Sequence, residues 1–133
     1  MTISPRDQEI LAINQAMLES VAGGNWENYS QVCSTEISCF EGESEGHLVE
    51  GHAFHRYYFD LASQSQSQSA PSPVNITMAR PHLRWLSDDA VVVSYTRLTQ
   101  TIHNGEPITT RCCETRIWQQ SEGTWLQVHV HRS

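Results

Sequence analysis

The first part of the chain has apolar residues at helical spacing. A Ser-Pro start at residues 4–5 and a Gly-Gly stop at residues 23–24 enclose an apolar stripe that recurs every three to four positions, as on one face of a helix. Asn25 is placed to cap a second, shorter helix. A third helix is predicted near Gly51 to Ala62, from the helical spacing of Phe54, Tyr57, Tyr58 and Leu61.

The rest of the chain alternates between apolar and polar residues, as half-buried strands do. A short strand is expected near Ile37 to Phe40, and longer ones over residues 74–85, 90–102, 107–120 and 124–132. Pro81 predicts a bulge or an edge position, and Asn104-Gly105 is a strong hairpin signal. Residues 63–73 (SQSQSQSAPSP) are polar and repetitive, which predicts a mobile loop inside a domain.

Three helices followed by about four long antiparallel strands indicate an α+β fold. Long strands twist, so we expect a strongly curved antiparallel sheet that wraps around the three N-terminal helices and leaves a conical cavity. The 133 residues suffice for one hydrophobic core. Neither of the two segments that flank residues 63–73 is expected to fold by itself, so residues 1–133 are expected to form a single domain.

Three arginines lie on strand faces that are otherwise apolar: Arg97, Arg116 and Arg132. Successive side chains of a strand point to opposite faces, so residues of the same parity share a face. Arg97 shares its face with Val91, Val93 and Tyr95, and Arg116 shares its face with Trp118. Arg132 shares its face with Leu126, Val128 and Val130. Arginine is seldom buried unless it is paired, so the pattern predicts a pocket that binds an anion. The alternative is that each arginine is exposed or is bonded to a buried carboxylate, for which Glu114 is the obvious candidate.

Composition narrows the class of partner. The formal net charge of −7 makes nucleic acid a poor partner. No apolar segment is long enough for a signal peptide or a membrane span, and the four cysteines have no CxxC spacing, so a reduced, cytoplasmic protein is expected. His129 and His131 are predicted to share the outer strand face with Trp125 and Gln127, but no third ligand is identifiable. No metal site and no cofactor are therefore predicted.

Three segments resemble a known family. LVEGHAFHRYYFD (residues 48–60), YTRLTQ (95–100) and ETRIWQQSEGTWLQVHVHRS (114–133) are similar to the association, or hub, domain of calcium/calmodulin-dependent protein kinase II. The stretch QEILAINQAMLESVAGGNWENYSQVC also fits that family. The chain has neither the Gly-rich loop nor the H-R-D motif of a kinase, so the resemblance implies a free-standing relative of the hub.

The resemblance implies both a fold and a site. The fold is the cystatin-like, nuclear transport factor 2-like cone, whose members form dimers that in the kinase stack into closed rings. The site is a pocket implicated in binding small carboxylates, and the motifs place its residues at His55, Arg97, Arg116 and Arg132. The same three arginines are the ones that strand parity assigns to apolar faces.

These observations lead to three hypotheses. The first is a non-catalytic module that associates with itself through the outer sheet face, where Val92, Leu98, Ile117 and Trp125 would supply the contact. The second, compatible with the first, is binding of a small anionic ligand in the arginine pocket. The alternative is an isomerase-like or dehydratase-like enzyme that uses the same cone, since this fold hosts such enzymes; no acid–base pair can be placed from the sequence, so no catalytic residue is assigned.

Overall fold

A computed structural model describes residues 3–65 and 73–133 of the chain. The helices are α1 (Pro5–Ala22), α2 (Trp26–Gln31), the short 3-10 turn η1 (Gly42–Ser44) and α3 (His52–Ser65). The strands are β1 (Cys33–Phe40), β2 (Val49–Glu50), β3 (Val74–Ser87), β4 (Ala90–His103), β5 (Glu106–Ser121) and β6 (Thr124–Arg132). The predicted order of elements is confirmed.

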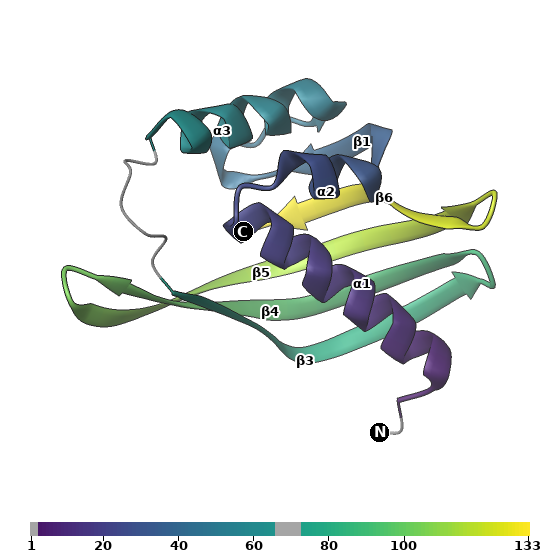
Figure 1. The fold of residues 1–133 in the computed structure, drawn as a ribbon. Coiled ribbons are helices and arrows are strands. Elements are labelled where there is room, and N and C mark those ends of the chain that lie inside the picture. Colours follow the sequence, from purple (N-terminus) through teal and green to yellow (C-terminus); the bar gives the residue numbers. More distant parts are fainter. Residues whose placement is uncertain (1–2, 66–72) are drawn as a thin grey trace.

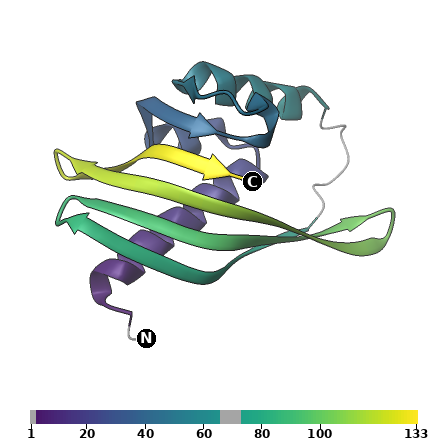
Figure 2. The ribbon, with the colours of Figure 1, turned by 180° about the vertical axis from the view of Figure 1, so that it is seen from behind.

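The strands form one six-stranded sheet in the order β2-β1-β6-β5-β4-β3. Strands β3 to β6 are an antiparallel meander, as predicted, while β1 pairs with β6 in parallel. α1 runs diagonally across one face of the sheet, and α3 lies over β1 (Figure 1). Figure 2 shows the opposite face of the meander, over which no helix of the described residues lies. The architecture is therefore a helical layer on a curved sheet that is open on its other side.

Local sequence signals account for where the elements begin. The Ser4 hydroxyl accepts from the Asp7 backbone N–H, and the Asp7 carboxylate accepts from the Ser4 N–H, so α1 starts with a complete capping box. The Asn25 side chain caps α2 by accepting from the Asn28 backbone N–H. α3 extends to Ser65, beyond the predicted end, so residues 63–65 are helical rather than loop. The rest of the predicted mobile loop, residues 66–72, lies outside the described residues.

The predictions for the Asn104-Gly105 hairpin and for Pro81 are both confirmed. Asn104 and Gly105 have φ of 51° and 77° and connect β4 directly to β5, as a two-residue hairpin loop requires. β3 is an edge strand, and its pairing with β4 shifts between Ala79 and His82. Arg80, which precedes Pro81, has a φ of 53° at this irregularity. Pro81 thus lies both on an edge strand and at a bulge.

The face assignments in β6 need a correction. Trp118 pairs with Gln127 and Ile117 pairs with His129, so Val128 is an extra residue that forms a β-bulge. A bulge reverses the side-chain alternation on one side of it. As a result Trp125 and Gln127, which were predicted to be on the outer face, are buried at 9% and 0% exposure.

Beyond the bulge the original parity holds. Val130 is buried on the face that packs against the helices, and Arg132 lies on the same face. Leu126, which precedes the bulge, lies instead on the outer face, although the sequence assigns it to the face of Val130 and Arg132. The two histidines are outside as predicted: the Phe40 ring contacts both His129 and His131. The prediction that Trp125 belongs to the self-association surface is therefore wrong. The other predicted residues of that surface are Val92, Leu98 and Ile117.

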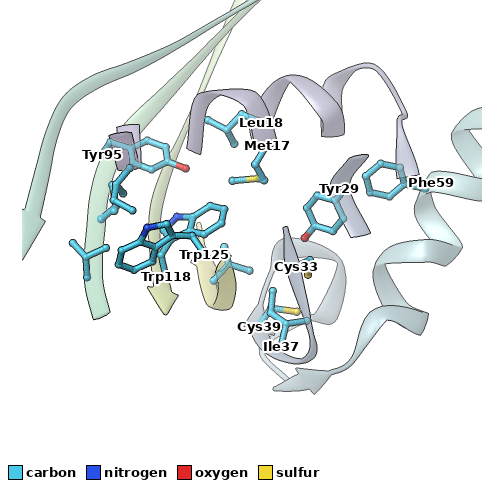
Figure 3. Packing of buried hydrophobic residues seen from close by; sticks show 14 residues of the cluster. Met17, Leu18, Tyr29, Cys33, Ile37, Cys39, Phe59, Tyr95, Trp118 and Trp125 are labelled. Carbon is cyan, nitrogen blue, oxygen red and sulfur yellow. The ribbon is translucent and has the colours of Figure 1, made fainter. Parts of the chain in front are cut away.

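The core fills the space between α1 and the sheet. Figure 3 shows Met17 of α1 pointing toward Trp118 and Trp125 of the sheet, while Tyr29 and Phe59 lie toward α3. The Tyr29 and Phe59 rings have centroids 5.1 Å apart, which ties α2 to α3. No helix within residues 3–65 or 73–133 is long and apolar enough to cross a membrane.

Candidate functional site

A cavity of about 230 Å³ opens between the helices and the inner face of the sheet. The four residues predicted from the sequence all line it: His55, Arg97, Arg116 and Arg132. The remaining lining residues include Tyr29, Phe59, Glu41 and Glu43. The structure therefore brings the predicted residues together from α3, β4, β5 and β6, and adds carboxylates and aromatic rings to them. Ligand binding by these residues stays a prediction.

Glu114 is the carboxylate around which two of the arginines are arranged. It is 3% exposed, and it lies 3.0 Å from Arg97 Nη1 through Oε2 and 3.0 Å from Arg116 Nη2 through Oε1. The Tyr95 hydroxyl donates to Glu114 Oε1 at 2.7 Å and accepts from Arg116 Nε at 2.9 Å. Arg116 is itself 3% exposed and also donates through Nη1 to Gln127 Oε1. The buried charge of Arg116 is thus fully paired and hydrogen-bonded.

A second group of charges lies around Arg132. Its guanidinium contacts Glu41 Oε1 at 3.3 Å and Glu43 Oε2 at 2.5 Å. The other oxygen of Glu41 lies 3.2 Å from His55 Nε2, and His55 Nδ1 lies 3.4 Å from the Tyr29 hydroxyl. Glu41 therefore bridges the strand-borne arginine and the helix-borne histidine.

The carboxylates of Glu114 and Glu41 are held in their charged form. Burial acts to raise the pKa of Glu114, but Arg116 and Arg97, together with the hydrogen bond from Tyr95, outweigh it and hold the pKa below its ordinary value. Burial likewise acts to raise the pKa of Glu41, and its contacts with His55 and Arg132 hold this pKa below its ordinary value as well. Both groups are carboxylates at neutral pH.

The sequence interpretation of the pocket as cationic is incomplete. Its alternative, a buried carboxylate partner at Glu114, is what the structure shows for Arg97 and Arg116. The acidic residues 41–45 have the composition of a solvated loop, yet Glu41 and Glu43 pair with Arg132. A signal for Glu41 was present, because it follows the buried Cys39 by two positions and so shares its face. The formal charges of the three arginines and three glutamates cancel.

One donor in this arrangement has no partner. Arg97 Nε is buried and makes no hydrogen bond within the described part of the chain. A buried N–H group without an acceptor is costly, and such groups are normally satisfied by protein, water or a ligand. Arg97 therefore has capacity for one more acceptor although its Nη1 already contacts Glu114.

Comparison with known proteins identifies the family. The family model "calcium/calmodulin dependent protein kinase II association domain" matches residues 6–133. The chain belongs to this family. It is 38% identical over 132 residues to the calcium/calmodulin-dependent protein kinase type II of Caenorhabditis elegans, covering 98% of this chain but 17% of that kinase. Against the delta subunit from Oryctolagus cuniculus it is 36% identical, with 98% of this chain and 24% of the subunit covered. The chain thus spans a quarter or less of the length of these relatives.

Solved structures agree with the assignment to the association domain family. The hub homology domain from Chlamydomonas reinhardtii is 46% identical with a TM-score of 0.90, and 98% of each chain is covered. The association domain of the Caenorhabditis elegans kinase is 36% identical with a TM-score of 0.85, covering 96% of this chain and 95% of that one. A Streptomyces avermitilis protein of the nuclear transport factor 2-like family has a TM-score of 0.75 at 15% identity, which shows a shared fold. The predicted α+β cone fold is confirmed.

Proposed function

We propose that this chain is a non-catalytic self-association module, which forms a dimer and, from dimers, a closed ring. Membership of the association domain family supports this proposal. The observation that carries it is the sheet face seen in Figure 2, over which none of the described helices lies. Val92 and Ile117 are paired neighbours on that face, and both are half-buried within the single chain. A second copy that covers this face would remove their remaining apolar surface from water.

Light scattering on the purified chain tests the self-association. The expected mass is a multiple of 15.1 kDa, and Ile117→Asp is expected to lower it because the aspartate would place a charge in the contact. Leu61→Asp is the matched control, since Leu61 is exposed on α3, on the helical side of the sheet. A wild-type mass of one chain, or equal masses for wild type and Ile117→Asp, would end this proposal.

The second part of the proposal is that the cavity binds a small carboxylate through His55, Arg97, Arg116 and Arg132. The supporting observations are that these four side chains line one cavity and that Arg97 Nε makes no hydrogen bond to any residue that the structure describes. A carboxylate accepts two parallel N–H bonds from a guanidinium. The volume of about 230 Å³ is smaller than the cavities that take drug-sized ligands, so it suits an acid of a few carbon atoms.

Thermal denaturation with butyrate and butyramide tests the carboxylate proposal. The two molecules have nearly the same shape, so a rise in Tm with butyrate alone reports recognition of the charge. Arg97→Gln is expected to abolish the rise. Arg6→Gln is the control, because Arg6 also pairs with a carboxylate, at 3.7 Å from Asp88, but does not line the cavity. Equal rises for both additives, or an undiminished rise in Arg97→Gln, would refute carboxylate binding at this site.

A further inference from the structure

Three metal-ligating side chains converge at the wall of the cavity: Cys39, Glu41 and His55. His55 Nε2 lies 3.3 Å from Cys39 Sγ and 3.2 Å from Glu41 Oε2, and all three atoms lie within 4.8 Å of one another. Cys39 and His55 are buried, and Glu41 is half-buried. Cys39 lies near the end of β1 (Figure 3), and Glu41 follows it by two residues on the same face. His55 is contributed by α3.

The arrangement places three electron-pair donors around one point. An ionised carboxylate only accepts hydrogen bonds, and neutral imidazole has one nitrogen that only accepts. When the imidazole proton is on Nδ1, the Nε2 lone pair faces the Glu41 oxygen with no hydrogen between them. The cluster is therefore satisfied either by a hydrogen on Nε2, which donates to Glu41, or by a cation at that point.

We propose that Cys39, Glu41 and His55 form a binding site for a divalent transition metal ion of the zinc class. A thiolate, an imidazole and a carboxylate are the ligand types that zinc takes in proteins. Tetrahedral coordination with ordinary zinc bond lengths separates a nitrogen and an oxygen ligand by about 3.4 Å, and a nitrogen and a sulfur ligand by about 3.6 Å. The observed 3.2 Å and 3.3 Å lie within a few tenths of an ångström of these values, and the ligand atoms of Cys39 and Glu41 lie within 4.8 Å of each other.

The surrounding residues orient the ligands for this role. The Tyr29 hydroxyl, which lies 3.4 Å from His55 Nδ1, can accept a hydrogen bond from Nδ1–H, and this tautomer leaves Nε2 free for the metal. Arg132 contacts Glu41 through Oε1, whereas the oxygen that faces His55 is Oε2, so one carboxylate bond to the metal leaves the ion pair intact. Cys39 loses its thiol proton to solvent when the ion binds. The ion, thiolate and carboxylate then sum to zero charge, and Arg132 stays balanced by Glu43.

Three ligands leave one tetrahedral position for a fourth group. Glu41 and His55 line the cavity, while Cys39 does not, so the ion would lie in the wall with its fourth position toward the cavity. Such an arrangement is typical of zinc sites that keep an open position. The metal site goes beyond the proposed function, and Cys39→Ser tests it without altering a residue of the carboxylate pocket.

Cobalt substitution tests the site directly. The starting protein carries Cys112→Ser and Cys113→Ser, because these two cysteines are the ones that are not buried. Titration of the reduced, metal-free protein with Co²⁺ is expected to give one equivalent of bound ion with a thiolate-to-cobalt charge-transfer band, and Zn²⁺ is expected to abolish the band. Cys39→Ser should lack the band. Cys33→Ser, which changes an equally buried cysteine of the same strand, should keep it.

Two further measurements do not depend on whether Cys39→Ser folds. X-ray absorption of the zinc-loaded starting protein should show one sulfur at about 2.3 Å and lighter ligands at about 2.0–2.2 Å. Tyr29→Phe should keep the band and weaken binding about tenfold, because it removes the group that orients His55. The absence of a band in folded starting protein, a band that persists in Cys39→Ser, or a zinc shell without sulfur would overturn the proposal.

Discussion

Replacing Glu114 by glutamine tests the central feature of the pocket, a single buried carboxylate shared by two arginines. The glutamine keeps the size of the side chain, and its carbonyl oxygen can still accept from Tyr95 and Arg116. It loses the negative charge that balances Arg116, which is 3% exposed and cannot deprotonate. Removing one partner of a buried ion pair costs about 3–5 kcal/mol. Because the hydrogen bonds from Tyr95 and Arg116 are retained, the lower end, about 3 kcal/mol, is expected.

Urea denaturation of wild type and Glu114→Gln at the same protein concentration measures this loss at pH 7. Equal concentration matters because an oligomer gains stability by mass action. Glu106→Gln is the matched control, since it makes the same chemical change at an exposed position of β5 and is expected to change the free energy of unfolding by no more than about 0.5 kcal/mol. A Glu114→Gln protein as stable as wild type would refute the view that the carboxylate neutralises a buried guanidinium.

The same pair of proteins has a predictable dependence on pH. The pKa of Glu114 is lower in the folded protein than its ordinary value, despite burial, because of Arg116, Arg97 and Tyr95. A group with a depressed folded pKa stabilises the protein above its unfolded pKa, which is about 4.3 for glutamate. The stability difference between wild type and Glu114→Gln should therefore be constant above about pH 5 and shrink as the pH falls through the folded pKa of Glu114. A difference that grows on acidification would contradict the sign of this shift.

Three further substitutions are expected to affect the free energy of unfolding in urea. Asn14→Ala should cost about 1–3 kcal/mol, because the Trp118 indole N–H donates to Asn14 Oδ1 at 3.0 Å in a buried position; the exposed Asn28→Ala should cost less. Gly51→Ala should cost about 1–2 kcal/mol because Gly51 has a φ of 87°, whereas Gly42→Ala, at a position with open space and no positive φ, should cost less. Ser4→Ala should cost about 1 kcal/mol through loss of the α1 cap, and an unchanged stability would show that the cap contributes nothing measurable.

The sequence predicts those parts of the fold that depend on local signals. Helix starts at Ser4 and Asn25 and the hairpin at Asn104-Gly105 follow from cap and turn chemistry, which acts within a few residues. The parallel pairing of β1 with β6 joins segments about 90 residues apart, such as Cys39 and Val130. No local pattern specifies such a partner, since pairing depends on which apolar faces the whole chain can bury together.

The same distinction applies to the pocket. Strand parity alone assigns Arg97 and Arg116 to the inner face, and Glu114 to the same face as their partner, as found. The partners of Arg132 come from residues 41–43, about ninety positions away in the sequence. An acidic loop has the same composition whether it is solvated or folded onto a guanidinium, so composition alone does not distinguish the two, and the one signal is the spacing of Glu41 from Cys39. His55 entered the prediction through the resemblance, because helical spacing carries no information about what its imidazole contacts.

The bulge at Val128 shows how one residue decides what the pocket contains. Without an extra residue in β6, the alternation that places Val130 inside would place Gln127 outside. Gln127 is instead fully buried, where its oxygen accepts from Arg116 Nη1 and its Nε2 donates to the Tyr29 hydroxyl at 3.3 Å. Tyr29 in turn contacts His55. The bulge thus connects the Glu114–Arg116 pair to the histidine, which makes the two charge groups of the cavity one continuous hydrogen-bonded network.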